Sequence, residues 1–204
     1  MYENIKQEAE LIWQRVKEIL SRKEQLILAI DGRCGAGKTT LASYLQTVCD
    51  CNVIPMDHFF LRPEQRTKER LMQPGGNVDY ERFLKEVLEP FKEGEAFSYR
   101  PYDCQKQKLL GERYIVPGKI TIVEGSYSCH PKLRAFYDIT IFMTVDEREQ
   151  CCRIEKRNGK EAFSVFKDKW IPLEETYFSA CDIPEKCDFC FDTGQSLGTP
   201  RGTI

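Results

Sequence analysis

The chain has 204 residues, of which 41% are hydrophobic and 30% are charged, and its formal net charge is −2. This length and composition suit one sizeable α/β core and exclude a second full domain. Basic residues are spread along the chain and no apolar run reaches the length of a membrane span, so we expect neither a nucleic-acid nor a membrane partner.

Helical and strand-like segments alternate in the first half of the chain. Residues 3–20 carry apolar side chains at helical spacing among charges, which predicts an amphipathic helix. The run LILAID at 26–31 is apolar throughout, as expected of a strand buried on both faces, and the segment KTTLASYLQTVC after it predicts a helix. A second short strand is expected at 52–57, and a helix at 79–94 that stops at Gly94.

The second half opens with an insertion and then returns to the same alternation. Two antiparallel arms between residues 96 and 116 predict a β-hairpin, whose period of two places Ser98, Arg100 and Tyr102 on one face. The remaining expected elements are strands at 119–125 and 138–145, a charged helix at 146–157, a helical region at 162–180 interrupted at Pro172, and a last strand in CDFCFDT.

The stretch GRCGAGKT between the first strand and its helix matches the pattern G-x-x-x-x-G-K-[ST]. Its glycines let the backbone curl so that successive N–H groups point at a phosphate, and the helix adds its positive N-terminal end. Lys38 is expected to reach the β- and γ-phosphates and Thr39 to ligate Mg²⁺, so ATP and Mg²⁺ are the expected cofactors. The expected nucleotide-contacting residues are Gly32, Arg33, Cys34, Gly35, Ala36, Gly37, Lys38, Thr39 and Thr40.

Two acidic residues follow neighbouring strands. Glu124 ends the apolar run ITIVEG, and we favour it as a second magnesium ligand over an ordinary strand-end carboxylate. Asp57 ends the strand at 52–57, on the same carboxyl edge of the sheet, where a carboxylate can accept the proton of an attacking hydroxyl. The alternative for Asp57 is a helix N-cap that bonds the N–H groups of residues 59 or 60, and one residue could serve both purposes.

These features favour an ATP-dependent small-molecule kinase, which transfers the γ-phosphoryl group to a hydroxyl of a nucleoside-like acceptor. The sequence has no NKxD, no DxxG at a strand end and no LSGGQ, the elements of GTP switches and transporter ATPases. Two alternatives stay open. One is a nucleotide-binding regulatory protein with little or no transfer activity. The other is a kinase for a sugar, a vitamin precursor or a nucleotide, and Arg62, Arg66 and Arg100 supply the cations that a nucleotide acceptor needs.

The order of GRCGAGKTT, PMDHFF, NVDYERF, RPYD, IVEG and CCRIEKR resembles the motif order of the uridine kinase family, which belongs with the phosphoribulokinase-like P-loop kinases. The resemblance covers roughly residues 26 to 192. It implies that Asp57 activates the acceptor hydroxyl, that Asp79 holds ribose-type hydroxyls and that Tyr102 forms a wall of the acceptor pocket. It matches Glu124 to the family's strand-end acid.

The resemblance also implies that Arg153 and Arg157 clamp the phosphates from a lid helix. Their spacing of four residues places them on one helical face, as a joint clamp requires. The alternative is a solvated charged helix. The expected catalytic residues are therefore Asp57, Lys38, Arg153 and Arg157.

The chain departs from this family at two places. In PYDCQKQK, Gln107 stands near the position of a family histidine, and RNGKEAFSVFKDKW lacks the family's Arg-Gly-Arg lid. Lysines in that segment cannot replace a guanidinium fork one for one, so the acceptor stays open. The expected substrate-facing residues are Asp57, Phe60, Asp79, Arg100, Tyr102 and Gln107.

The elements and motifs together predict a P-loop NTPase-type three-layer α/β sandwich with a mostly parallel five-stranded sheet, a small β-hairpin insertion and a helical lid. Residues 1–192 are expected to form a single P-loop kinase domain, in which 96–116 is the insertion over the acceptor site and 150–170 is the lid region. Residues 193–204 are expected to form a polar C-terminal tail. Dimers and tetramers are common in the family that the chain resembles, so whether this chain forms a homo-oligomer stays open.

Ten cysteines are present, and the N-terminus carries mixed charges rather than a signal peptide. With a nucleotide motif in the same chain, these features predict a reducing, cytoplasmic location and free thiols. Cys187 and Cys190 form a CxxC, but there is no second pair and neither histidine lies near in sequence. We therefore interpret them as apolar strand residues rather than as zinc ligands.

Overall fold

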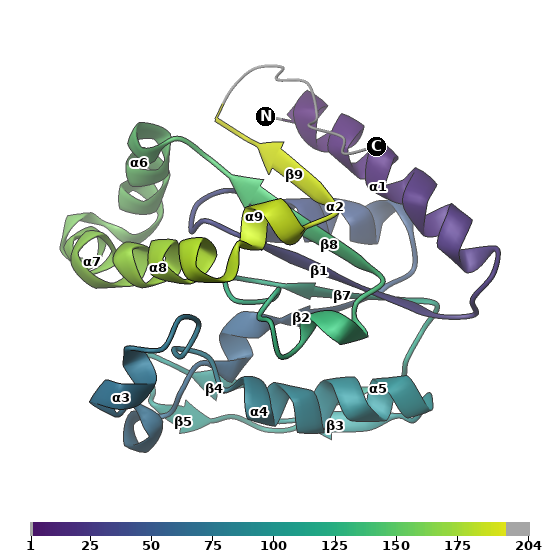
Figure 1. The fold of residues 1–204 in the computed structure, drawn as a ribbon, viewed down its shortest axis with the longest axis horizontal. Helices are drawn as coiled ribbons and strands as arrows, with labels where there is room; N and C mark the ends of the chain where they lie inside the picture. The colour runs from purple at the N-terminus through teal and green to yellow at the C-terminus, as the bar shows by residue number, and fades with distance from the viewer. Residues whose placement is uncertain (1, 195–204) are drawn as a thin grey trace.

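The computed structural model describes residues 2–194, with a five-stranded parallel sheet at its centre (Figure 1). The strand order is β2-β7-β1-β8-β9, and every neighbouring pair is parallel. The strands are β1 (Leu26–Gly32), β2 (Asn52–Pro55), β7 (Ile120–Glu124), β8 (Ile139–Thr144) and β9 (Phe189–Asp192). This confirms the predicted five-stranded α/β sheet. The assignment of residues 1–192 to a single domain stays a prediction, and most of the predicted tail (195–204) lies outside the described residues.

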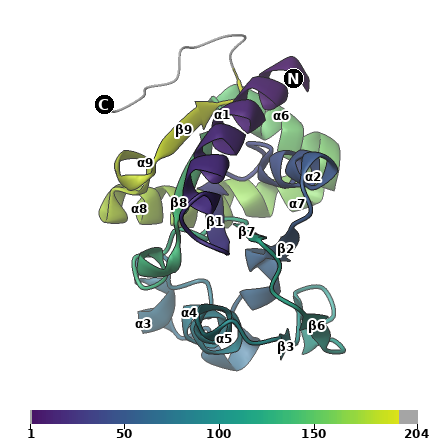
Figure 2. The same ribbon diagram turned by 90° about the vertical axis from the view of Figure 1, so that its right-hand side faces the viewer.

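The two faces of β1 separate two apolar cores, because successive side chains of a strand point to opposite faces. Leu28 and Ile30 pack with α1 (Tyr2–Leu20) and α2 (Lys38–Val48), whereas Ile27 packs with the helix of residues 80–93 and with α8 (Ile171–Cys181). Figures 1 and 2 show helices on both sides of the sheet. Each fully buried aliphatic side chain contributes about 1.5–3 kcal/mol, so the three layers are held mainly by these cores.

Two helices contain a π-helical segment beside a proline. Residues 80–93 run as α4 (Tyr80–Phe83), a π segment (Leu84–Leu88) and α5 (Glu89–Glu93). Residues 160–181 run as α7 (Lys160–Val165), a π segment (Phe166–Trp170) and α8 (Ile171–Cys181). Pro90 and Pro172 each follow a π segment by two residues. A proline lacks the N–H for the regular α pattern, so the turn before it widens.

The remaining helices are short, apart from α6 (Glu147–Asn158), which begins the predicted lid region. They are α3 (Lys68–Leu71) and α9 (Ile183–Lys186). Figure 1 shows α6 on the upper left, α7 and α8 below it, and α3 at the lower left. No helix among residues 2–194 is both long enough and apolar enough to cross a membrane.

The predicted insertion consists of two small antiparallel sheets. β3 (Phe97–Tyr99) pairs with β6 (Arg113–Ile115), and β4 (Tyr102–Asp103) pairs with β5 (Lys108–Leu109). Ser98 and Arg100 are exposed, as their alternation predicts, but Tyr102 is buried. The prediction that Tyr102 shares their face is wrong because the chain leaves the first sheet at Pro101 and enters the second one.

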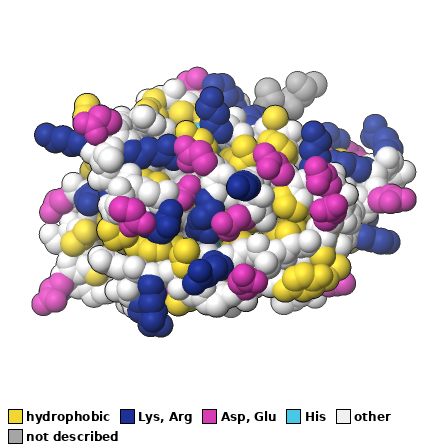
Figure 3. Space-filling view, turned by 90° about the horizontal axis from the view of Figure 1, so that it is seen from below, with side chains coloured by type: hydrophobic (Ala, Val, Ile, Leu, Met, Phe, Trp, Pro, Cys, Tyr) yellow, Lys and Arg dark blue, Asp and Glu magenta, His cyan; other side chains and the backbone are white. Residues whose placement is uncertain are grey.

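The side of the molecule seen from below carries mixed charges (Figure 3). Basic and acidic side chains are interspersed there with apolar ones, so this side has no large field of one sign. In the part of the chain that the structure describes, no group of three or more His, Cys, Asp or Glu side chains could hold a metal ion. Cys187 Sγ lies 3.8 Å from Cys129 Sγ.

Candidate active site

The loop between β1 and α2 has the backbone that its glycines predict. Gly35 and Gly37 have φ values of 80° and 94°, in the left-handed region that favours glycine. Gly32 has φ 136°, and a Cβ there would lie 2.0 Å from the carbonyl oxygen of Met143 on β8. Gly37 is also the residue before α2, so the helix begins directly at Lys38. The loop is therefore wrapped tightly around the N-terminal end of α2, where anions bind.

Lys38 is the buried cation of this loop. Its Nζ donates to the carbonyl oxygens of Gly32 at 2.6 Å and Arg33 at 3.0 Å. Ser126 Oγ lies 3.4 Å from the same nitrogen. These three acceptors hold the ammonium group at the loop, and Lys38 lines the cleft beside it.

A cleft of about 660 Å³ lies beside the loop. Its phosphate-binding side is formed by Cys34, Gly35 and residues 37–40. The other three residues of the expected nucleotide site do not line the cleft. Gly32 packs against β8, Ala36 is buried in the core, and Arg33 makes a bidentate ion pair with Glu175 at 2.6 and 2.9 Å.

Thr39 and Glu124, the two residues expected to ligate magnesium, meet at the carboxyl edge of the sheet. Thr39 Oγ1 donates to Glu124 Oε2 at 3.1 Å, and the Glu124 side chain is buried. Burial raises the pKa of Glu124, and the nearby Asp57 carboxylate raises it further, whereas Thr39 and Lys38 lower it. Oxygen ligands from one or two carboxylates and a hydroxyl are what Mg²⁺ takes beside nucleotide phosphates, so these residues fit a magnesium ion.

Asp57 lies in a 3₁₀ turn, Met56–Phe59, directly after β2. Pro55 caps this turn, no side-chain cap bond is present, and the N-cap alternative for Asp57 is therefore not seen among the described residues. Its side chain is open to the cleft yet surrounded by protein, so desolvation raises the pKa of Asp57, against the lowering effects of Lys38 and Arg157. A Cβ on Gly125 would lie 3.3 Å from Asp57 Oδ1, which shows how closely the two segments pack.

Asp31 orders the loop that follows β7. Its carboxylate is fully buried and accepts from the backbone N–H groups of Gly32, Tyr127 and Cys129 at 2.7–3.0 Å, and from the Tyr177 hydroxyl at 2.8 Å. Burial raises its pKa, and the hydrogen bonds oppose that rise. The carboxylate thus joins the phosphate loop to the loop that carries the cleft residues Gly125, Ser126 and Tyr127.

Arg153 and Arg157 of α6 both line the cleft, so their helical face is not merely solvated. Arg153 donates to the carbonyl oxygens of Gly35 at 3.1 Å and Thr193 at 2.9 Å, and it pairs with Glu149 at 2.8 Å. Arg157 Nη2 lies 3.3 Å from Cys34 Sγ. Arg153 is therefore tied to the phosphate loop, whereas Arg157 reaches over it.

Glu174 and Ser126 both line the cleft, and neither was expected from the sequence. Glu174 on α8 accepts from the Ser126 hydroxyl at 2.6 Å and from the Cys34 backbone N–H at 3.0 Å. Burial raises the pKa of Glu174, and Lys38 lowers it. The one sequence signal for Glu174 is that it follows Pro172 at the start of a helical segment. The neighbouring Glu175 has the same signal, so the sequence does not tell which of the two lines the cleft.

The side of the cleft away from the phosphate loop is mainly aromatic and polar. It contains the expected Phe60, together with Arg66, Asn77 and Cys104 from segments before and within the insertion. Phe166 and Trp170 line the cleft from the lid region. Asp57 lines the same cleft as both groups of residues.

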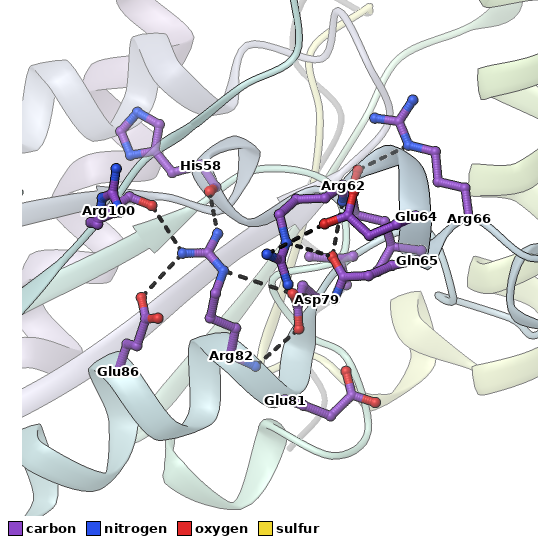
Figure 4. A network of polar contacts seen from close by, with 12 residues as sticks. His58, Arg62, Glu64, Gln65, Arg66, Asp79, Glu81, Arg82, Glu86 and Arg100 are labelled. Atoms are coloured by element: carbon purple, nitrogen blue, oxygen red, sulfur yellow. Dashed lines mark hydrogen bonds and ion pairs between the residues drawn. The ribbon is translucent and has the colours of Figure 1, made fainter. Parts of the chain in front are cut away.

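Asp79 is not among the cleft residues, because it is used within the fold (Figure 4). Its Oδ1 accepts from the backbone N–H of Arg82 at 3.1 Å, which makes it the N-cap of α4. Its Oδ2 accepts from Gln65 Nε2 at 2.7 Å and lies 3.8 Å from Arg82 Nε. The expectation that Asp79 holds an acceptor finds no support in this geometry.

Three more expected substrate residues lie away from the cleft lining. Arg100 is exposed and donates from Nε to the Leu110 carbonyl oxygen at 3.0 Å. Gln107 is exposed in the turn between β4 and β5, with φ 49°. Tyr102 is 3% exposed, and its hydroxyl has no hydrogen-bond partner among the described residues. The insertion thus leaves two of these side chains on the surface and buries the third, and none of the three lines the cleft.

Comparison with known proteins gives solved structures that cover most of the chain and curated proteins that match part of it. No family model matches the chain. An Arabidopsis thaliana protein described as inorganic pyrophosphatase TTM2 is 30% identical over 138 residues, which is 64% of this chain. The chain spans only 20% of the length of that relative.

Three solved structures cover most of the chain. A possible uridine kinase from Bacillus stearothermophilus has a TM-score of 0.63 and 21% identity, covering 89% of this chain and 99% of its own. A putative fructose transport system kinase from Silicibacter sp. TM1040 has a TM-score of 0.66 and 22% identity, covering 84% of this chain and 94% of its own. YFH7 from Saccharomyces cerevisiae, described as a putative P-loop containing kinase, has a TM-score of 0.67 and 12% identity. The match covers 95% of this chain and 100% of the YFH7 chain. The chain therefore has the three-layer α/β fold of P-loop kinases.

Proposed function

We propose that the protein is a uridine kinase-like, ATP-dependent kinase that phosphorylates a hydroxyl group of a small molecule. The observation that carries this proposal is the position of Asp57. Its carboxylate opens into the same cleft as Lys38, Thr39 and Glu124, and it has no bonded partner among the described residues. A carboxylate so placed is suited to an acceptor hydroxyl rather than to holding the fold.

The transfer itself needs few groups. The acceptor oxygen attacks the γ-phosphorus, the bond from that phosphorus to the β–γ bridging oxygen breaks, and ADP leaves with that electron pair. The hydroxyl proton passes to the carboxylate of Asp57. Lys38 and Arg157 stabilise the negative charge on the transferred group. Mg²⁺ held by Thr39 and Glu124 would neutralise phosphate charge.

The lid region has a second function in this proposal. Phe166 and Trp170 place aromatic surface over the cleft, and Arg157 reaches from the same side toward Cys34. Closure of this side around both substrates would exclude water, which would otherwise accept the phosphoryl group.

The test is ADP release from Mg·ATP with a panel of nucleosides, sugars and vitamins, scored above the rate without acceptor. Stimulation by a hydroxyl compound, with a phosphorylated product seen by mass spectrometry, is the expected result. If no compound stimulates ADP release, the regulatory alternative replaces this proposal. Pyrophosphate belongs in the same panel with phosphate release as its readout, because the curated relative is described as an inorganic pyrophosphatase.

A further inference from the structure

One arginine on the acceptor side of the cleft has unused hydrogen-bonding capacity. Arg66 Nε donates to the Leu61 carbonyl oxygen at 2.9 Å, which anchors the side chain to its own loop. Its two terminal nitrogens have no acceptor among the described residues, although Arg66 is half-buried and lines the cleft. Figure 4 shows its guanidinium group apart from the ion pairs around Arg82.

The two other arginines that could have received a charged acceptor are already engaged. Arg62 Nε bonds Gln65 Oε1 at 3.2 Å, and its Nη1 lies 3.4 Å from Glu64. Arg100 is exposed and bonds a backbone carbonyl. Neither of them lines the cleft, so the structure distinguishes Arg66 from these two arginines.

Arg66 and Asp57 both line the cleft. Both act on Cys104, which also lines it: desolvation raises the pKa of the Cys104 thiol, Arg66 lowers it and Asp57 raises it. The phosphate side of the cleft has its own cations on other elements, Lys38 at the start of α2 and Arg157 on α6. Arg66 is therefore an additional cation of the cleft, which comes from a different segment of the chain than Lys38 and Arg157 do and lines the cleft together with Asp57 and Cys104.

We propose that Arg66 is a specificity-determining residue that binds an anionic group of the acceptor, either a phosphate or a carboxylate. This inference rests on the proposed kinase function. Arginine presents a planar fork of donors that fits both anions, and such charge-assisted pairs are stronger than neutral hydrogen bonds. The acceptor is then a small molecule with an anion at one end and a hydroxyl near Asp57 at the other.

Matched pairs of acceptors test this proposal. Uridine and uridine monophosphate, ribose and ribose 5-phosphate, and glycerol and glycerate each differ by one anionic group. We expect kcat/KM to be at least about tenfold higher for the anionic member of a pair that is used. The uridine and ribose pairs test whether the anionic group is a phosphate, and the glycerol pair tests whether it is a carboxylate.

Variants of Arg66 connect that preference to one side chain. Arg66→Gln should raise KM for the anionic acceptor by about 10- to 100-fold, while kcat and the KM for ATP stay close to wild type. Arg66→Lys keeps the charge but loses the fork, so its KM should fall between the two. Arg62→Gln is the matched control, with no change expected. Thermal melting of all three variants checks that they fold.

The outcomes separate this inference from the function on which it rests. Phosphorylation of neutral acceptors alone, or an unchanged KM for the anionic acceptor in folded Arg66→Gln, overturns the role of Arg66 and leaves the kinase function intact. If no acceptor of either kind stimulates ADP release, the kinase function fails and this inference fails with it.

Discussion

Glu174 Oε2 accepts a hydrogen bond of 3.0 Å from the backbone N–H of Cys34, so α8 is bonded directly to the phosphate loop. Its other oxygen accepts from Ser126 in the loop after β7. Both oxygens are satisfied, which a buried carboxylate needs because unpaired polar groups are costly inside a protein. One side chain thus connects three segments that are far apart in the sequence.

Loss of this carboxylate should destabilise the protein. Glu174→Ala leaves the Cys34 N–H and the Ser126 hydroxyl without their partner, so we expect the free energy of unfolding to fall by about 1–3 kcal/mol. Glu174→Gln keeps a carbonyl oxygen for the N–H group and should lose less. Denaturant unfolding measures both, with the exposed Glu185→Ala as control. Equal stability of Glu174→Ala and wild type would contradict this role.

Replacing Asp57 by Asn should remove transfer without weakening ATP binding. The amide cannot accept the acceptor proton, so we expect kcat to fall by about 10²- to 10⁴-fold. Calorimetry should give a nearly unchanged ATP affinity, and Asp50→Asn, at an exposed position, is the control. Full turnover by Asp57→Asn would show that another group takes the proton.

The pH dependence of the wild-type enzyme provides a second check on Asp57. Desolvation raises the pKa of this carboxylate, and the base must be deprotonated to act. The acid side of the kcat profile should therefore lie above the usual carboxylate range, and it should be absent from the residual activity of Asp57→Asn.

The side of the site nearest the phosphate loop could be predicted from the sequence because its signals are local. The pattern around Lys38 fixes a backbone shape, and Glu124 and Asp57 follow apolar strands whose carboxyl ends lie at one edge of the sheet. A buried parallel strand is readable from a continuous apolar run, which also explains why the sheet was predicted correctly.

The acceptor side could not be predicted in the same way, because it depends on contacts between distant segments. Asp79 looks like a substrate ligand in sequence, yet it caps α4 and bonds Gln65. Glu174 gains its position only when α8 packs against the phosphate loop. Tyr102 points inward because the chain changes sheets at Pro101, a tertiary effect that alternation along one strand does not show.

Removing the Glu124 carboxylate should change the magnesium requirement. Glu124→Gln leaves a neutral oxygen beside Thr39, so a divalent cation loses a charged ligand. We expect the magnesium concentration for half-maximal activity to rise by at least about tenfold. Titration of magnesium at fixed ATP measures this, and Thr47→Val on the exposed part of α2 is the control. An unchanged magnesium requirement would remove Glu124 from the proposed metal site.

Gly125 should tolerate no side chain. Its φ is 140°, and a Cβ would lie 2.9 Å from Met56 Cβ and 3.3 Å from Asp57 Oδ1. Gly125→Ala should therefore cost about 1–3 kcal/mol of stability and displace Asp57, with a loss of kcat. Gly111→Ala is the matched control, because a Cβ there meets nothing within 4 Å. Wild-type kcat and stability in Gly125→Ala would contradict the tight packing.

Glu8 should make the stability of the protein fall as pH rises. It is 8% exposed on α1, its Oε2 has no hydrogen-bond partner among the described residues, and burial raises its pKa from 4.5 to about 7. The folded state thus holds this proton more tightly than the unfolded state does. The associated stability is fully present below pH 4.5 and is lost as pH rises through 7.

At about 1.4 kcal/mol per pH unit, the loss is on the order of 3 kcal/mol. Glu8→Gln should remove this part of the pH dependence, because an amide does not titrate. Unfolding by denaturant at pH 5 and pH 8 measures the difference between variant and wild type, so the contributions of other buried acids cancel. Glu10→Gln, at an exposed position of the same helix, should keep the wild-type slope. Parallel slopes for Glu8→Gln and wild type would show that Glu8 is ionised in the folded protein at neutral pH.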